Sequence, residues 1–230
     1  MINLGKFLFD LQYKKGICTF FLKSVLFFIS LFYRFAIYLR NLGFDYEIFH
    51  SDKLPVPVIS IGNITTGGTG KTPASIWLSM EILKIGMVPV IVSRGYGSDE
   101  IEMVKKIVPD VKCFANKKRY LAGKEAISNL GEKICIILDD GFQHRMLKRD
   151  IDIVLIDASN PFGFQHLLPR GFLREPVQSL KRASAIILTK CDMISEKDVE
   201  NLENKIRSLS EAKIARSLHV PKNLIDLFSD

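Results

Sequence analysis

From Pro55 onward, short apolar runs alternate with longer segments in which apolar residues recur every three or four positions. The runs are rich in β-branched residues, which is typical of parallel strands covered on both faces. The expected strands are Val56–Ile61, Val88–Val92, Val111–Phe114, Ile134–Leu138, Ile151–Ile156 and Ala185–Leu188. The expected helices are Lys71–Ile85, Asp99–Val108, Lys118–Leu130 and a last one from Ser195. This alternation predicts a doubly wound α/β domain with a mostly parallel sheet.

Residues 1–53 have a different pattern, and we treat them as a separate helical segment. Ile17–Leu39 is dense in Phe, Leu, Ile and Tyr, and only Lys23 and Arg34 interrupt it. Its uninterrupted apolar run, Ser24–Tyr33, has about half of the roughly 20 residues that a membrane-spanning helix needs. Snorkelling cations would let the longer segment cross, and a helix lying in the headgroup plane is the alternative. A signal peptide and a buried core helix are less favoured, so we expect membrane association.

The composition is that of a folded, basic protein. The chain has 47% hydrophobic and 25% charged residues, which excludes wholesale disorder, and its net charge is +7. A basic excess fits nucleic acid, an anionic membrane or an anionic substrate. The four cysteines form no C-x-x-C pair, so the sequence indicates neither a disulfide framework nor a zinc site.

The segment 58–73 reads as a buried strand, a glycine-rich turn and the start of a helix, which is the layout of a phosphate-binding loop. Lys71 would reach the terminal phosphates, and the Thr72 hydroxyl would contact Mg²⁺. The common spacing G-x-x-x-x-G-K-[ST] requires glycine at Thr65, so this loop has the shorter form G-G-x-G-K-T. The residues expected around the nucleotide are Asn63, Thr65, Thr66, Gly67, Gly68, Thr69, Gly70, Lys71 and Thr72.

Residues just after the strands are the other place to look, because ligands of such sheets bind at the carboxyl ends of strands. Asp139 and Asp140 follow the fourth expected strand, where a carboxylate typically holds Mg²⁺. Asp157, after the fifth strand, is a rival for that role. Asp99 opens a helix, where an N-cap is the plain alternative to a catalytic carboxylate.

Several cations follow the strands as well. Arg94, Arg170 and Arg174 are expected to recognise anions, since guanidinium matches phosphate geometry. For the last two, a surface loop with an Arg174–Glu175 pair is the alternative. The segment 189–192, Thr-Lys-Cys-Asp, has the form of a guanine-reading element, although so short a motif is often accidental.

Taken together, these motifs resemble the tetraacyldisaccharide 4'-kinases of lipid A biosynthesis. The matching pieces are LPVPVISIGNITTGGTGKTP, SRGY, DDGFQHR followed by RD, and LLPRGFLREP with LTK after it, in that order over about residues 10–192. The combination of DDGFQHR with GGTGKTP is specific. The resemblance implies a P-loop kinase domain over residues 54–230, preceded by the membrane-associated segment 1–53.

The resemblance also implies an activity. Such kinases use ATP and Mg²⁺ to phosphorylate the 4' hydroxyl of a membrane-embedded disaccharide 1-phosphate, giving lipid IVA, at the cytoplasmic face of the bacterial inner membrane. The implied partners are the lipid A disaccharide precursor and inner-membrane lipids, with no nucleic acid. The implied catalytic residues are Asp99, Asp139, Asp140 and Lys71, and the implied metal ligands are Thr72, Asp139 and Glu100. The implied contacts to the substrate phosphate or lipid are Arg94, Gln143, His144, Arg170 and Arg174.

The sequence departs from the family pattern in two places. The stretch between SRGY and Asp99 is short, and Asp99-Glu100 is followed by Ile101 where the family has proline. The chain ends at Asp230, so we expect the family's second, C-terminal lobe to be absent. An inactive nucleotide-binding fragment is therefore an alternative, and the guanine-reading-like segment 189–192 keeps a membrane-associated P-loop GTPase as another.

Overall fold

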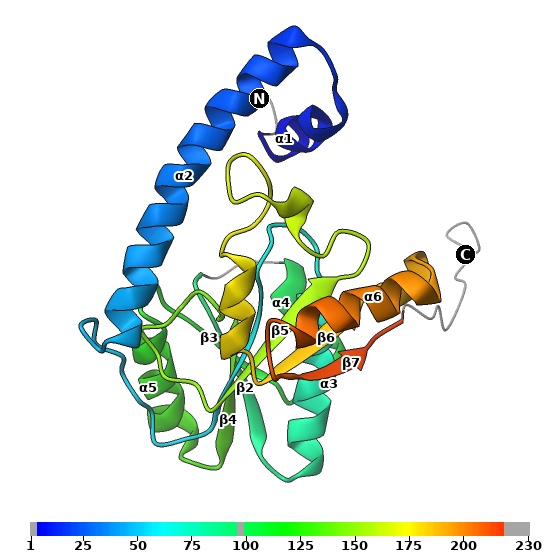
Figure 1. Cartoon of the computed structure of the whole chain (residues 1–230). Coiled ribbons are helices and arrows are strands. Elements are labelled where there is room, and N and C mark those ends of the chain that lie inside the picture. The colour runs from blue at the N-terminus through cyan, green and yellow to red at the C-terminus, as the bar shows by residue number, and fades with distance from the viewer. Residues whose placement is uncertain (1–3, 96–98, 219–230) are drawn as a thin grey trace.

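The structure is a computed structural model that describes residues 4–95 and 99–218. Its centre is a seven-stranded parallel sheet in the order β3-β2-β4-β1-β5-β6-β7 (Figure 1). The strands are β1 Val58–Asn63, β2 Val88–Ser93, β3 Lys112–Ala115, β4 Ile134–Asp139, β5 Ile151–Asp157, β6 Ala185–Thr189 and β7 Lys213–Arg216. This confirms the predicted fold class.

Helices connect the strands. The α-helices are α1 Leu4–Tyr13, α2 Ile17–Asp45, α3 Lys71–Lys84, α4 Asp99–Ile107, α5 Arg119–Leu130 and α6 Glu196–Arg207, and the short 3-10 helices are η1 Gly163–Gln165, η2 Val177–Arg182 and η3 Cys191–Met193. The capping-box start of α6 is confirmed, because the Ser195 side chain accepts a hydrogen bond from the Asp198 backbone N–H. Helix α3 ends next to Gly86, whose φ of 75° is the left-handed conformation that glycine favours after a helix.

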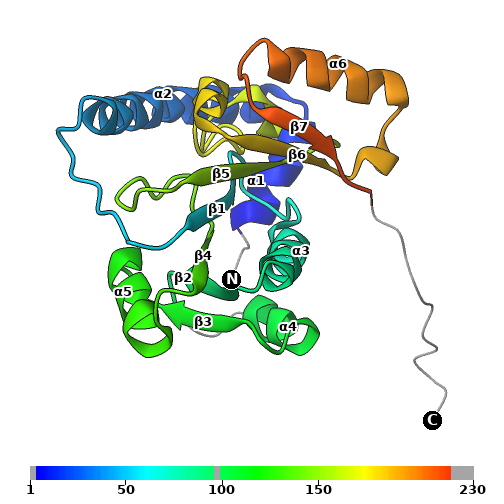
Figure 2. The same ribbon diagram turned by 90° about the horizontal axis from the view of Figure 1, so that it is seen from below.

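The core lies on both faces of the sheet. Apolar side chains of α3 and α4 cover one face through Leu78, Ile82 and Val104. Helix α5 covers part of the other face, and α6 and η2 cover the rest, as the edge-on view shows (Figure 2). The buried strand residues are mostly Ile, Val and Leu, as expected for a parallel sheet with two covered faces.

Strand β7 and helices α1 and α2 differ from the pattern-based expectation. Strand β7 was not predicted, because only Ile214 and Ala215 are apolar in it and it forms an exposed edge of the sheet. Helix α1 was not predicted as a separate helix either. Helix α2 begins with the apolar stretch at Ile17 and continues six residues beyond Leu39 to Asp45, and Gly43 lies there against the ring of Phe49, where a Cβ would come within 2.4 Å.

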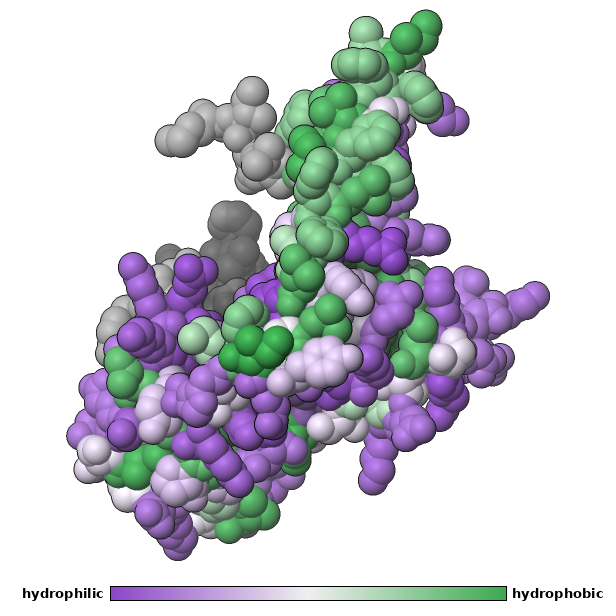
Figure 3. All heavy atoms as spheres, turned by 60° about the vertical axis from the view of Figure 1, so that its left-hand side comes forward, coloured by the Kyte–Doolittle hydropathy of each residue, from purple (hydrophilic) through white to green (hydrophobic). Residues whose placement is uncertain are grey.

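Helix α2 extends beyond the body of the molecule. Its apolar side chains form the projecting hydrophobic surface in Figure 3. By length and composition α2 is able to cross a membrane, and only 11% of its most apolar window is buried. Phe20, Phe21, Phe28 and Phe32 are 62–78% exposed. A buried core helix, one of the alternatives from the sequence, does not fit these exposures.

Candidate active site

The glycine-rich segment forms an open loop between β1 and α3. Gly67 and Gly70 have φ values of 123° and 87°, which L side chains rarely adopt, and Gly70 is the N-cap of α3. A Cβ on Gly67 or Gly68 would meet nothing within 4 Å, so the loop leaves space beside its backbone. The first N–H groups of α3 lack helical partners and carry partial positive charge. The loop therefore has the geometry and the electrostatics to bind phosphate groups.

Two residues that were expected at the phosphates brace the loop from behind. Asn63 and Thr69 are 0% and 2% exposed, and the Asn63 side-chain amide donates to Thr69 Oγ1 at 2.8 Å. Thr189 Oγ1 in turn donates to the Thr69 carbonyl at 3.1 Å, which ties the loop to the end of β6. The side chains of Asn63 and Thr69 thus hold the loop's shape, while Thr66, Gly67 and Gly68 are exposed.

The segment after β5 closes over the start of the loop. The Thr66 N–H donates to the Phe172 carbonyl at 2.8 Å, and Thr65 forms a β-bridge with Leu173. The Arg174 N–H donates to the Ile64 carbonyl at 2.7 Å. These backbone bonds place the Arg174 side chain at the phosphate-binding loop.

The acidic pair lies beside the loop at the end of β4. Asp140 has a left-handed φ of 48° and accepts two hydrogen bonds from Arg174 NH1, at 2.7 and 3.0 Å. Lys71 Nζ is 3.9 Å from Asp140 Oδ1. Burial alone would raise the pKa of Asp140, but Arg174, Lys71 and Arg119 outweigh it and hold that pKa below its ordinary value. The structure therefore joins Lys71, Asp140 and Arg174, from three distant segments, in one charged cluster.

Arg119 is a member of this site that the sequence reasoning missed. It is the first residue of α5 and only 7% exposed, and its guanidinium donates to the Asp139 carbonyl at 3.5 Å. Burial lowers the pKa of Arg119, and the negative charges of Asp139 and Asp140 oppose that shift. Its Nε is buried and has no hydrogen-bond partner among the described residues. The only signal in the sequence is a basic run, 117–119, directly after an expected strand.

Gln143 and His144, which follow the acidic pair, have different surroundings. Gln143 Nε2 donates to the Asn63 carbonyl at 2.7 Å, and its buried Oε1 accepts no hydrogen bond from the described residues. Burial and the positive charges of Arg119 and Arg149 lower the pKa of His144 to about 4. His144 is therefore a neutral imidazole at physiological pH.

The remaining predicted site residues do not join this cluster. Arg94 is exposed after β2, near enough to Arg119 for its charge to lower the pKa of that residue. Arg170 contacts α1 instead, where its NH1 donates to Gln12 Oε1 at 2.7 Å. Asp99 and Glu100 are the first two residues of α4, and their side chains lie outside the described part of the structure.

Two of the alternatives from the sequence are engaged with each other. Asp157, the rival metal ligand, forms an ion pair with Lys190 of the guanine-reading-like segment. Asp157 also accepts from Ser159 Oγ at 2.6 Å. Arg174 and Glu175 do not form the surface pair considered above, since Arg174 binds Asp140 and Glu175 is fully buried.

Comparison with known proteins agrees with this geometry. The sequence model of the family described as tetraacyldisaccharide-1-P 4'-kinase matches residues 22–109 and 98–226. A tetraacyldisaccharide 4'-kinase of Syntrophus aciditrophicus (strain SB) is 39% identical over 228 residues, covering 86% of this chain and 61% of that protein. A probable mitochondrial tetraacyldisaccharide 4'-kinase of Arabidopsis thaliana is 34% identical over 226 residues, covering 86% of this chain and 57% of that protein.

A solved structure shares the fold. The "apo" form of LpxK from Aquifex aeolicus, crystallised in complex with ATP, superimposes with a TM-score of 0.66 at 28% identity and covers 88% of this chain and 83% of that chain. The present chain spans about three fifths of the length of the curated relatives named above. The family match over most of the chain, together with these identities, shows that the chain belongs to the tetraacyldisaccharide-1-P 4'-kinase family.

Proposed function

We propose that this protein transfers the γ-phosphoryl group of ATP to the 4' hydroxyl of a tetraacyldisaccharide 1-phosphate. The new bond joins the 4' oxygen to the γ-phosphorus, the bond from that phosphorus to the β,γ-bridging oxygen breaks, and ADP leaves. The proposal rests on the position of Asp140, which forms ion pairs with Lys71 and Arg174 beside an open phosphate-binding loop. Family membership supports the choice of donor and acceptor.

Most catalysis of phosphoryl transfer comes from positioning and charge stabilisation, so the roles of the residues follow from their charge and place. The N–H groups of the loop and of the first turn of α3 that are not already bonded to carbonyl oxygens would bind the phosphate oxygens, and Lys71 would neutralise charge on the terminal phosphates. Arg119 would add a buried positive charge beside them. We assign the proton of the 4' hydroxyl to Asp99, as the family pattern predicts.

We propose that a magnesium ion binds beside the loop. The described residues include no group of three His, Cys, Asp or Glu side chains able to hold a metal. Mg²⁺ at nucleotide sites commonly takes only one or two protein ligands and completes its shell with phosphate oxygens and water. Thr72, Asp139 and Glu100 are the proposed ligands. When bound, the ion supplies positive charge that stabilises the negative charge on the transferring group.

The acceptor is a lipid, and the N-terminal segment 1–53 supports such a substrate. Helix α2 carries an exposed apolar surface that a bilayer would cover (Figure 3). We therefore place the protein at the cytoplasmic face of the bacterial inner membrane, where ATP is available. Arg94, Arg170, Gln143 and His144 are proposed contacts for the acceptor's sugar and 1-phosphate. Arg174 is less free for that role because it already binds Asp140.

A transfer assay tests the proposal. The full chain is incubated with ATP, Mg²⁺ and the disaccharide acceptor in detergent micelles, and phosphorylation of the acceptor is followed. We expect product from the natural chain and little from Asp140→Asn or Lys71→Met. Tight ATP binding without any transfer would contradict the proposal and identify an inactive nucleotide-binding fragment. Tight GTP binding that ATP cannot displace would indicate a GTPase instead.

A further inference from the structure

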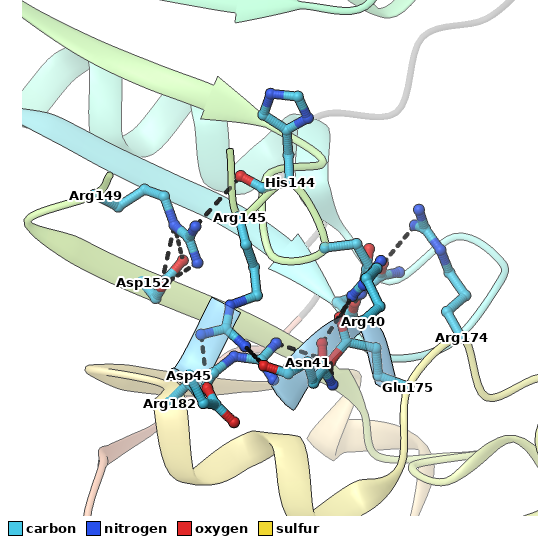
Figure 4. Close-up of polar contacts among 12 residues, drawn as sticks. Arg40, Asn41, Asp45, His144, Arg145, Arg149, Asp152, Arg174, Glu175 and Arg182 are labelled. Atoms are coloured by element: carbon cyan, nitrogen blue, oxygen red, sulfur yellow. Dashed lines mark hydrogen bonds and ion pairs between the residues drawn. The ribbon is translucent and has the colours of Figure 1, made fainter. Parts of the chain in front are cut away.

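Glu175 is a fully buried carboxylate at the base of the membrane-associated helix. Arg40 of α2 donates to its Oε1 at 2.8 Å, and Arg182 of η2 donates to its Oε2 at 2.8 Å (Figure 4). Asn41 of α2 adds a longer bond of 3.4 Å to Oε2. Both oxygens are thus bound by arginines from two elements far apart in the sequence. Such a buried charge is tolerated only when it is paired, and removing one partner leaves the other uncompensated.

The carboxylate is ionised at neutral pH. Burial alone would raise the pKa of Glu175, but the charges and hydrogen bonds of Arg182, Ser179 and Arg40 outweigh it and hold that pKa below its ordinary value. The Arg40 side chain is 31% exposed and that of Arg182 is 15% exposed, so water and salt screen the two ion pairs only in part.

Two sets of contacts connect Glu175 to the acidic pair, Asp139 and Asp140. The first is the chain itself, because Arg174 precedes Glu175 and binds Asp140 through its side chain. The second is Arg182, whose guanidinium lies 4.5 Å from the ring centroid of Phe142, two residues after Asp140. Both connections are short and consist of buried or half-buried groups.

Helix α2 makes a further contact on the same segment. Two turns before Arg40, Tyr33 Oη donates to the Arg174 carbonyl at 3.0 Å. Helix α2 therefore holds residues 174 and 175 at two points. Because α2 has 29 residues, it spans roughly 40 Å, and a small tilt at this base displaces its far end by several ångströms.

We propose that Arg40, Glu175 and Arg182 form a clamp that fixes helix α2 relative to the Arg174–Asp140 pair, and that these three are positioning residues for transfer to a membrane-held acceptor. The proposal rests on the proposed function, since it concerns how a lipid acceptor near α2 meets the phosphate donor. A clamp of this kind affects transfer to the lipid acceptor more than it affects ATP binding, because in the described part of the structure the side chains of the three residues form no hydrogen bond or ion pair with the loop residues 66–72.

The test compares two clamp variants, Glu175→Gln and Arg40→Met, with Arg34→Met as the matched control. Arg34 lies on the same helix and is exposed, so its substitution removes an equal charge outside the clamp. For the full chain in micelles we expect the clamp variants to lose about 10- to 100-fold in kcat toward the lipid acceptor, since misplacing reacting groups by about 1 Å can cost up to roughly 100-fold in rate. Their ATP dissociation constant should stay within about twofold of the natural chain's. Arg40→Lys should recover part of the loss.

A distance measurement makes the test independent of catalysis. Spin labels are attached to the exposed Cys18 at the start of α2 and to Cys introduced at Ser128 on α5, in a background with Cys113→Ala. The distance distribution should broaden in both clamp variants and remain narrow in Arg34→Met. An unchanged distribution, or a kcat loss matched by an equal loss of ATP affinity, would overturn the clamp. Absence of transfer by the natural chain would instead refute the proposed function, while the distances still report on the clamp.

Discussion

Replacing Gly62 with alanine tests whether the acidic pair is positioned by close packing between two strands. Gly62 lies in β1, and a Cβ added there would be 2.6 Å from Phe142 Cβ and 2.7 Å from Phe142 N. Ordinary contact begins near 3.4 Å, so β1 and the segment after β4 must separate by about 0.8 Å. Phe142 is fully buried, and the Gly141 N–H is bonded to the Ile61 carbonyl at 3.1 Å, so neither side moves easily.

Two magnitudes follow from this geometry. Overpacking of a core typically costs about 1–3 kcal/mol in the free energy of unfolding. For a domain of this size that lowers Tm by roughly 2–12 °C. Asp139 and Asp140 precede Phe142 by three and two residues, so the same separation moves them away from the loop. We expect a loss of about 10- to 100-fold in phosphoryl transfer.

Thermal unfolding followed by circular dichroism, together with a transfer assay, measures both effects. Gly95→Ala is the matched control for stability, because a Cβ there meets nothing within 4 Å. If Gly62→Ala unfolds at the same temperature as Gly95→Ala and retains full activity, the close approach of β1 to Phe142 does not position the acidic pair.

Three further substitutions test individual contacts of the site. Arg174→Met should raise the pKa of Asp140, because Arg174 chiefly opposes the effect of burial on that pKa. The acidic limb of the profile of kcat/KM against pH should then move to higher pH, and an unmoved limb would refute the role of Arg174. The imidazole NMR signals of His144, whose pKa is about 4, should not titrate between about pH 5.5 and 8. Arg119→Met should raise that pKa because it removes one of the positive charges that lower it, and a titration midpoint near pH 6.5 in the natural chain would contradict the buried geometry. Thr69→Val should cost about 1–3 kcal/mol in unfolding because it leaves the Asn63 amide without its acceptor, while Thr69→Ser should not; equal melting of the two variants would show that the bond contributes nothing.

The sheet was predictable because its strands are self-contained apolar runs. Each of the six expected strands is present, with ends shifted by one or two residues where a polar residue such as Asn63 or Asp139 completes the strand. Strand β7 was missed because an exposed edge strand needs no apolar run. Helix α1 was missed because its place depends on contacts with the distant segment after β5, where Phe9 stacks on Phe172.

The site was predictable as far as local motifs reach. The glycine-rich turn with Gly70 and Lys71 follows β1, and Asp140 follows β4, the parallel neighbour of β1. The carboxyl ends of neighbouring parallel strands lie at the same edge of the sheet, so the local motifs are enough to predict that these residues lie close together. Arg119 was missed because a lysine- and arginine-rich helix start is common on protein surfaces. Arg170 contacts Gln12 of α1, and Glu175 is buried against Arg40 of α2. Both contacts depend on how the two helices pack against the segment after β5, which no local sequence pattern indicates.

We propose that this chain phosphorylates a lipid-held disaccharide through the phosphate-binding loop and the cluster of Lys71, Asp140 and Arg174. The most direct measurement uses ATP labelled in its γ-phosphate and locates the label on the disaccharide product by phosphorus NMR or mass spectrometry. Label on the 4' oxygen with the natural chain, and its loss with Asp140→Asn, is the predicted result. Label at another position, or equal transfer by Asp140→Asn, would contradict the account.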